Sequence, residues 1–159
     1  MGCKRVDRSD DRTRWGSLRP RLALALLLLA GVAMANDIKS SEVVVVVAAR
    51  SPLESLSQAA LTDVFLGRTS RFPDGRPAVP VDLREGSAAR AEFYETYLGR
   101  SVAQIKAHWS KIVFTGRGSP PREVADGLEM RRLVAQDPRA IGYLEPSLID
   151  DSVKKVRIE

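Results

Sequence analysis

The chain has 159 residues, one cysteine, one histidine and a formal net charge of +5. One cysteine cannot form a disulfide within the chain, and one histidine with one cysteine cannot build a metal site from several such ligands. We therefore expect no metal ion and no cofactor.

Most of the excess positive charge lies at the N-terminus. Residues 1–35 hold seven Lys/Arg and three Asp/Glu, which leaves 18 basic and 17 acidic residues in the rest of the chain. A net charge this close to zero gives no reason to expect nucleic acid or an anionic membrane as a partner of residues 36–159.

Residues 1–35 have the pattern of a cleavable secretory signal. A basic segment precedes the apolar run Leu22–Val32, and Ala33-Met34-Ala35 forms an A-x-A cleavage site. The run is too short to span a bilayer comfortably, and Cys3 stands before it rather than after it, where a lipid-anchored cysteine would lie. We expect cleavage after Ala35, export, and one domain over residues 36–159 that is not embedded in a membrane.

Strand and helix patterns alternate from the start of this domain. The β-branched run Val43–Val47 predicts a strand covered on both faces. A helix is expected next, with Ser57 as its N-cap and Gly67 at its end. A loop rich in turn residues leads to a second predicted strand, Ala78–Leu83.

Two further helices follow this strand. The first begins after Ser87 and ends at Gly99, with Phe93, Tyr94, Tyr97 and Leu98 on its buried side. The second begins with the capping box Ser101–Gln104 and carries Val102, Ile105, Trp109 and Ile112 at helical spacing. The spacing of Trp109, Tyr94 and Tyr97 predicts core positions, and His108 has no partner that would favour catalysis.

The last third of the domain predicts one helix and two strands. "TGRGSPP" is a loop, and Pro121 is expected as the first residue of a helix that contains Val124, Leu128 and Met130–Val134. "AIGYLEP" and "SVKKVRI" are expected as closing strands. The alternation predicts an α/β fold, with helices flanking a small, mostly parallel or mixed sheet.

Two polar turns could bind an anion, because ligands of open α/β sheets lie where strands lead into helices. In Glu85-Gly86-Ser87, the backbone N–H groups of Ala88 and Ala89 would face a ligand at a helix start. In Thr115-Gly116-Arg117-Gly118-Ser119, the glycines allow a close backbone approach. The candidate oxyanion ligands are Arg84, Gly86, Ser87, Ala88, Arg90, Thr115, Gly116, Arg117 and Gly118. Alternatively, Ser87 only caps a helix and the glycine loop is simply mobile.

The segments "LESLSQAALTDVFLGRTSRFPDGRPAVPV", "REGS" and "AIGYLE" resemble the phosphate-binding proteins of bacterial phosphate ABC transporters. They are most similar to the short relatives with a single type 2 periplasmic-binding domain. The resemblance covers the chain from about Val43 to its C-terminus. It implies a periplasmic location, a solute-binding fold, and inorganic phosphate or a similar oxyanion as ligand.

Residues 83–89 depart from the phosphate loop of that family, R-S-D-G-S-G-T. Gly86 and Ser87 keep the turn and the hydroxyl, and Glu85 keeps the acid. Leu83 stands at the arginine position and Ala89 at the threonine position. Arg84 is displaced by one residue, and Arg90 could supply the charge from the first helical turn.

The leading hypothesis is a non-enzymatic periplasmic protein that binds phosphate or a similar oxyanion for transport or sensing. The alternative is an interaction or sensor module that keeps the fold, has lost tight phosphate binding, and acts through a membrane transporter or sensor protein. The changes at Leu83 and Ala89 favour the alternative, whereas the Gly86-Ser87 turn favours binding.

Overall fold

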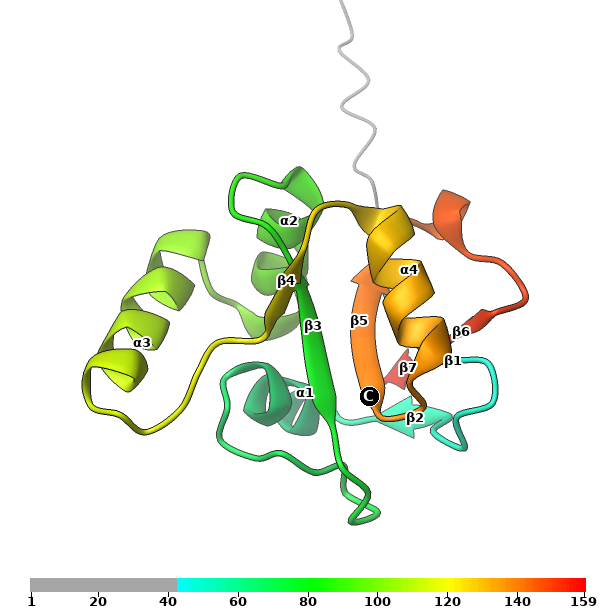
Figure 1. Cartoon of the computed structure of the whole chain (residues 1–159), viewed down its shortest axis with the longest axis horizontal. Coiled ribbons are helices and arrows are strands. Elements are labelled where there is room, and N and C mark those ends of the chain that lie inside the picture. Colours follow the sequence, from blue (N-terminus) through cyan, green and yellow to red (C-terminus); the bar gives the residue numbers. More distant parts are fainter. Residues whose placement is uncertain (1–42) are drawn as a thin grey trace, which may run out of the picture. The chain divides into compact units, whose positions relative to one another are not determined.

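A mixed five-stranded sheet forms the centre of residues 43–159, which are the residues described in this computed structural model (Figure 1). The expected export signal, residues 1–35, lies outside them. In spatial order the strands are β4 (Arg122–Val124), β3 (Val79–Leu83), β5 (Ala140–Leu144), β1 (Val44–Ala48) and β6 (Val153–Lys155). β4, β3 and β5 are mutually parallel, and β1 is antiparallel to both β5 and β6. Only β1 runs antiparallel to the other four strands, so the sheet is mostly parallel, as the predicted α/β fold requires.

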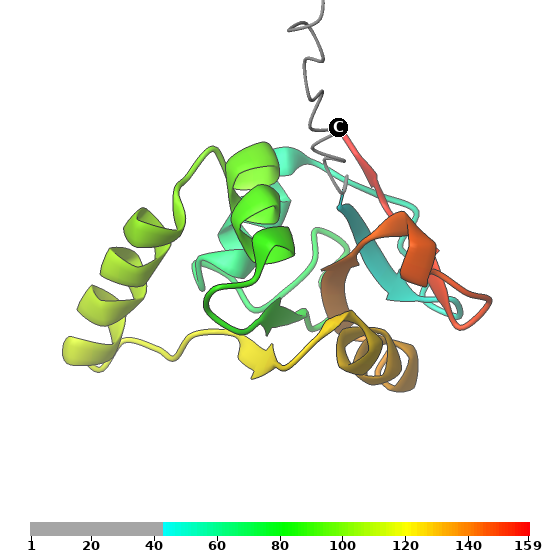
Figure 2. The same cartoon turned by 90° about the horizontal axis from the view of Figure 1, so that it is seen from above.

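Helices cover both faces of this sheet (Figures 1 and 2). α4 packs across β5, β1 and β3 on one face, and α1 and α2 lie on the other. α3 packs beside α2, away from the sheet. None of the described helices is long and apolar enough to cross a membrane. The bounds are α1 Gln58–Phe65, α2 Ala88–Leu98, α3 Val102–Phe114 and α4 Gly127–Gln136.

Three serines begin three of these helices as the sequence predicts. The side chains of Ser57, Ser87 and Ser101 accept hydrogen bonds from backbone N–H groups in the first turns of α1, α2 and α3. The capping box of Ser101 with Gln104 is complete. α2 ends at Gly99, whose φ of 61° is a left-handed conformation that a side chain would strain.

The core lies between the sheet and the helices. Val45 to Ala48 of β1 and all of β5 are buried, so the prediction of a strand covered on both faces is confirmed. Phe93 of α2 stacks on Tyr143 of β5, with ring centroids 4.0 Å apart. Tyr94 and Trp109 are buried, and Tyr97 packs against the core, so these aromatic positions are also confirmed. Full burial of one such ring is worth about 1.5–3 kcal/mol.

The prediction that Pro121 begins a helix is wrong. Residues 122–124 form β4, which pairs in parallel with β3, and Pro121 directly precedes this strand. The helix begins later because Asp126 caps it: its carboxylate accepts from the Glu129 N–H, and Glu129 accepts from the Ala125 N–H. Val124 therefore belongs to a strand rather than to the helix.

The two predicted closing strands are present. β5 covers "AIGYL" and leads through Glu145 into the short 3₁₀ helix Pro146–Leu148. "SVKKVRI" divides at Val156 into β6 and β7 (Arg157–Ile158), and β7 pairs in parallel with β2 (Ser55–Leu56) outside the main sheet.

Candidate functional site

A cavity of about 400 Å³ opens at the carboxyl ends of the parallel strands. Leu83 at the end of β3 and Leu144 at the end of β5 contribute to its wall, and Tyr143 lies beside them. Ligands of open α/β sheets bind at this edge. The cavity is therefore the candidate site, and its other lining residues are Arg84, Glu85, Gly86, Ser87, Ala89, Ala125, Asp126, Gly127, Glu145 and Leu148.

The N-terminus of α2 supplies one side of the cavity. Gly86 turns the chain with a φ of 86°, and Ser87 follows as the N-cap. The Ser87 side chain accepts from the Arg90 backbone N–H at 3.4 Å, so its own hydroxyl proton remains available to a ligand. The first N–H groups of a helix have no intrahelical acceptor and carry partial positive charge. The predicted turn thus lines the cavity, and Ser87 is also a cap.

The N-terminus of α4 supplies the opposite side, which the sequence analysis did not predict. Asp126 and Gly127 line the cavity at the start of this helix. The signal was present as a D-x-x-E capping box, which places a helix start at Asp126 rather than at Pro121. Two helix N-termini therefore point at one cavity.

Acidic side chains outnumber basic ones in the lining of the cavity. The guanidinium of Arg84 has no ion-pair partner among the described residues. Three carboxylates also line the cavity: Glu85 pairs with Lys106 at 3.2 Å, Asp126 caps α4, and Glu145 is unpaired within the described part of the chain. An anion would gain from Arg84 and from the helix ends, and would be repelled by Glu145 and by the Asp126 carboxylate at the start of α4.

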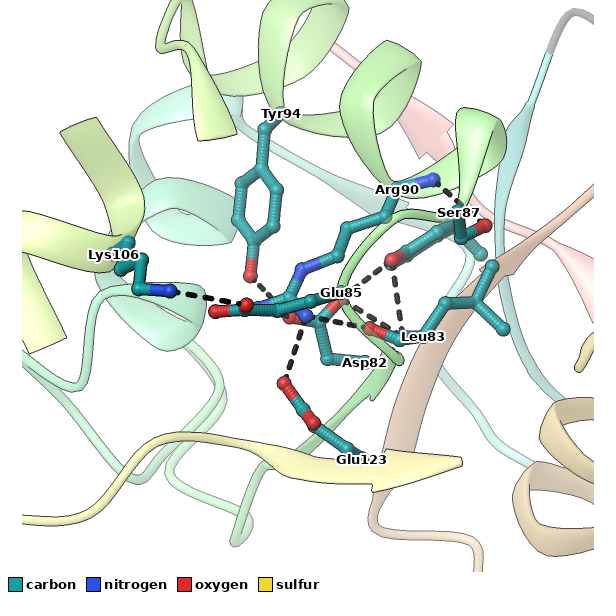
Figure 3. A network of polar contacts seen from close by, with 9 residues as sticks. Asp82, Leu83, Glu85, Ser87, Arg90, Tyr94, Lys106 and Glu123 are labelled. Carbon is teal, nitrogen blue, oxygen red and sulfur yellow. Dashed lines mark hydrogen bonds and ion pairs between the residues drawn. The ribbon is translucent and has the colours of Figure 1, made fainter. Parts of the chain in front are cut away.

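Beneath the Arg84–Ser87 turn lies a buried polar network centred on Asp82 of β3 (Figure 3). Arg90 of α2 forms an ion pair with the Asp82 carboxylate at 3.1 Å. Tyr94 of α2 donates to the same carboxylate at 2.6 Å, and Tyr143 of β5 donates to its other oxygen. The network therefore joins β3, β5 and α2 directly behind the cavity.

Burial raises the pKa of the Asp82 carboxyl above its ordinary value, although hydrogen bonds from Tyr143 and Tyr94 and the charge of Arg90 act against this. Burial and the charge of Asp82 also raise the pKa of Tyr94 and of Tyr143, so both phenols remain protonated and donate. Burial lowers the pKa of Arg90, but Asp82 and Glu123 raise it by more.

Arg90 occupies a different place from the one expected of an oxyanion ligand. Its side chain is only 7% exposed and runs toward Asp82 and Glu123, to which it pairs at 3.1 and 2.7 Å (Figure 3). It also donates to the Leu83 carbonyl at 2.9 Å. The guanidinium of Arg90 therefore neutralises the buried Asp82 carboxylate instead of facing a ligand. Arg90 does not line the cavity.

The glycine loop lies elsewhere. Thr115, Gly116, Arg117 and Gly118 follow the end of α3, and none of them lines the cavity at the Gly86-Ser87 turn. Both views place this loop at the far end of α3, away from the turn between β3 and α2 (Figures 1 and 2). The structure therefore does not bring the two turns together at one cavity. Ala88 is exposed at the start of α2.

Within residues 43–159, no group of three or more His, Cys, Asp or Glu side chains is arranged to hold a metal ion. His108 Nε2 lies 2.9 Å from the Leu66 carbonyl oxygen, next to the turn that ends α1. Its contact in this structure is thus with the backbone.

No protein-family model and no curated protein sequence matches this chain. Solved structures do match. A putative phosphate ABC transporter substrate-binding protein with bound phosphate from Clostridium perfringens is 19% identical, with a TM-score of 0.57, over 73% of this chain and 44% of that chain. An ABC-type phosphate transport receptor from Vibrio cholerae is 18% identical, with a TM-score of 0.56, over 73% and 45%. A possible phosphate binding protein from Planctomyces limnophilus is 15% identical, with a TM-score of 0.54, over 74% and 41%.

The fold is that of one lobe of a periplasmic binding protein. At these identities the likeness establishes the fold alone. The chain spans less than half the length of the proteins it matches.

Proposed function

We propose that residues 36–159 form a periplasmic solute-binding domain that binds inorganic phosphate or a similar small oxyanion and catalyses no reaction. One observation carries the proposal: the N-termini of α2 and α4 both open on one cavity, at the carboxyl ends of β3 and β5. The unpaired guanidinium of Arg84 and the hydroxyl of Ser87 lie on the same cavity. These are the donors that an oxyanion needs.

The same geometry implies weak binding. A hydrogen bond to a charged group is worth about 1.5–3 kcal/mol and a helix N-terminus about 0.3–1 kcal/mol. Arg84, Ser87 and two helix ends therefore supply about 4–8 kcal/mol, and the lower limit corresponds to a Kd on the order of 1 mM. The repulsion from Glu145 and the size of the cavity, which an oxyanion would not fill, both act against tighter binding.

A second candidate is an interaction or sensor module that acts through a membrane transporter or sensor protein. The specific support is that Arg90 is paired with Asp82 and Glu123, so it is not free to replace the arginine missing at Leu83. This candidate predicts no measurable oxyanion binding by the domain alone.

Calorimetric titration of the exported protein with phosphate, sulfate and acetate separates the two candidates. We expect millimolar phosphate binding that weakens about tenfold or more in Arg84→Gln, given the value of one charge-assisted hydrogen bond. Arg132→Gln is the matched control, because Arg132 is an exposed arginine of α4 that has no ion pair among residues 43–159 and does not line the cavity. Equal loss in both variants, or no heat with any anion, would refute oxyanion binding at this cavity.

A further inference from the structure

Two large hydrophobic side chains stand exposed at the end of α3. Val113 is 54% exposed and Phe114 is 93% exposed, and they are consecutive in the last turn of the helix. One other large hydrophobic residue of the described chain is classed as exposed: Leu128 on α4, at 49%. We call residues 111–117 the α3 tip. Val113 and Phe114 are not part of the core of the described domain, whereas Ile112 of the tip packs against it.

Basic residues outnumber acidic ones in the segment that contains this tip, and two of them, Lys111 and Arg117, belong to the tip itself. Between Arg100 and Arg122 the sequence contains five Lys/Arg and no Asp/Glu, although residues 36–159 as a whole are almost neutral. Only Lys106 has a carboxylate partner; the other four, Arg100, Lys111, Arg117 and Arg122, have none within the described residues. The near-zero net charge thus conceals a local excess of cations beside exposed apolar residues.

The nearest acids do not cancel this excess. Glu85 and Glu123 line a groove of about 480 Å³ beneath the tip, together with Val113 and Phe114. Glu85 is held by Lys106 at 3.2 Å, and Glu123 by Arg90 at 2.7 Å. Lys111 and Arg117 therefore set the charge at the end of the helix.

Hydrogen bonds within the tip cap the C-terminal end of α3, and the tip lies at an edge of the domain. The Thr115 hydroxyl donates to the carbonyls of Lys111 and Ile112, and the Arg117 N–H donates to Ile112. Gly116 turns the chain with a φ of 66°. In both views the end of α3 projects away from the sheet (Figures 1 and 2).

We propose that the α3 tip docks the domain on a lipid bilayer that contains anionic headgroups. Phe114 and Val113 enter the interfacial region, and Lys111 and Arg117 contact headgroup phosphates. Amphipathic helices bind membranes by this combination of apolar burial and attraction to anionic lipids.

The amount of exposed apolar surface favours a bilayer over a protein partner. A stable protein interface buries about 800 Å² on each side, whereas one aromatic side chain offers about 150–250 Å². Two side chains on a projecting helix end are too few for such an interface, but they suffice for weak, reversible insertion between headgroups. The tip is separate from the cavity, so this inference goes beyond the proposed function and does not depend on it.

Vesicle co-sedimentation of the exported protein tests the proposal. The vesicles are phosphatidylcholine alone and phosphatidylcholine with phosphatidylglycerol. We expect binding only to the anionic vesicles, weakened about tenfold in Phe114→Ser because burial of the ring is lost. Lys111→Gln with Arg117→Gln should weaken binding by about tenfold or more, since each cation near an anionic surface is worth about fivefold. Leu128→Ser is the matched control and should bind like the wild type.

Three results would overturn the proposal. The first is no binding of the wild type to anionic vesicles at low ionic strength. The second is equal loss in Phe114→Ser and Leu128→Ser. The third is self-association of the protein that Phe114→Ser abolishes while vesicle binding stays unchanged, which would make the tip a protein contact. Phosphate titration of Phe114→Ser should match the wild type, so failure here and failure of oxyanion binding are distinguishable.

Discussion

The buried pair of Asp82 and Arg90 yields a prediction whose size follows from the structure. Arg90→Met removes the guanidinium that lies 3.1 Å from the Asp82 carboxylate and leaves a side chain of similar length. The two side chains are 7% and 1% exposed, so water cannot replace the lost partner. Asp82 would then be a buried carboxylate supported by Tyr94, Tyr143 and the Leu83 N–H alone.

Removing one partner of a buried ion pair costs about 3–5 kcal/mol of the free energy of unfolding. The contact of Arg90 with half-exposed Glu123 adds at most about 1 kcal/mol. We therefore expect Arg90→Met to lose about 4 kcal/mol at pH 7. Adding Asp82→Asn should recover at least about 1 kcal/mol, because no charge is then left buried without a partner.

The pH dependence gives a second readout. Burial already raises the pKa of Asp82, and loss of Arg90 removes a charge that lowers it, so the folded-state pKa rises further above the unfolded value of about 3.9. A raised folded pKa means that the folded state binds the proton more tightly. The stability of Arg90→Met should therefore recover as the pH falls from neutral toward that unfolded value.

Urea unfolding of the wild type, both single variants and the double variant between pH 4 and pH 8 measures these effects. Subtracting the double variant from Arg90→Met cancels the titration of other groups. The reasoning is refuted if the two single costs simply add in the double variant, or if the cost of Arg90→Met does not change with pH.

Three further outcomes follow from other contacts. Glu145→Gln should tighten phosphate binding up to about fivefold by calorimetry, because it removes a repelling charge at the cavity; weaker binding would contradict this. Gly142→Ala should lower stability in urea by about 1–3 kcal/mol, since the added Cβ would lie 2.5 Å from the Met130 sulfur; an unchanged midpoint would count against it. Ser87→Ala and Ser101→Ala should each lose about 1 kcal/mol as caps, but only the former should weaken phosphate binding; equal effects on binding would reduce Ser87 to a cap.

Local signals predicted most of the elements. Ser57, Ser87 and Ser101 each cap a helix through contacts within the first turn, so a short stretch of sequence contains all the information required. The segment at Pro121 is different, because its conformation depends on pairing with β3 some forty residues earlier. Proline at a first helical position and proline before a short edge strand look alike until that pairing is known.

The half of the cavity that is formed by residues close in sequence was predictable from local signals. Arg84, Gly86 and Ser87 are neighbours in the chain and could be recognised as a turn at a helix start. Gly127 and Glu145 reach the same cavity only because β3, β4 and β5 are adjacent and parallel, an order that spacing does not reveal.

The place of Arg90 in the first turn of α2 predicts a contact with the ligand. Asp82 is a lone acid in an apolar strand and requires a buried cation, and Arg90 pairs with it instead.

The most direct test of oxyanion binding is to follow the backbone amide chemical shifts by NMR as phosphate is added to the protein. If two helix N-termini hold the anion, the amides of Ala88, Ala89, Gly127 and Leu128 should shift together and saturate in the millimolar range, that is on the order of 1 mM. Gly116 and Arg117 should not move with them. Shifts confined to the glycine loop, or none near α2 and α4 at any phosphate concentration, would contradict the account.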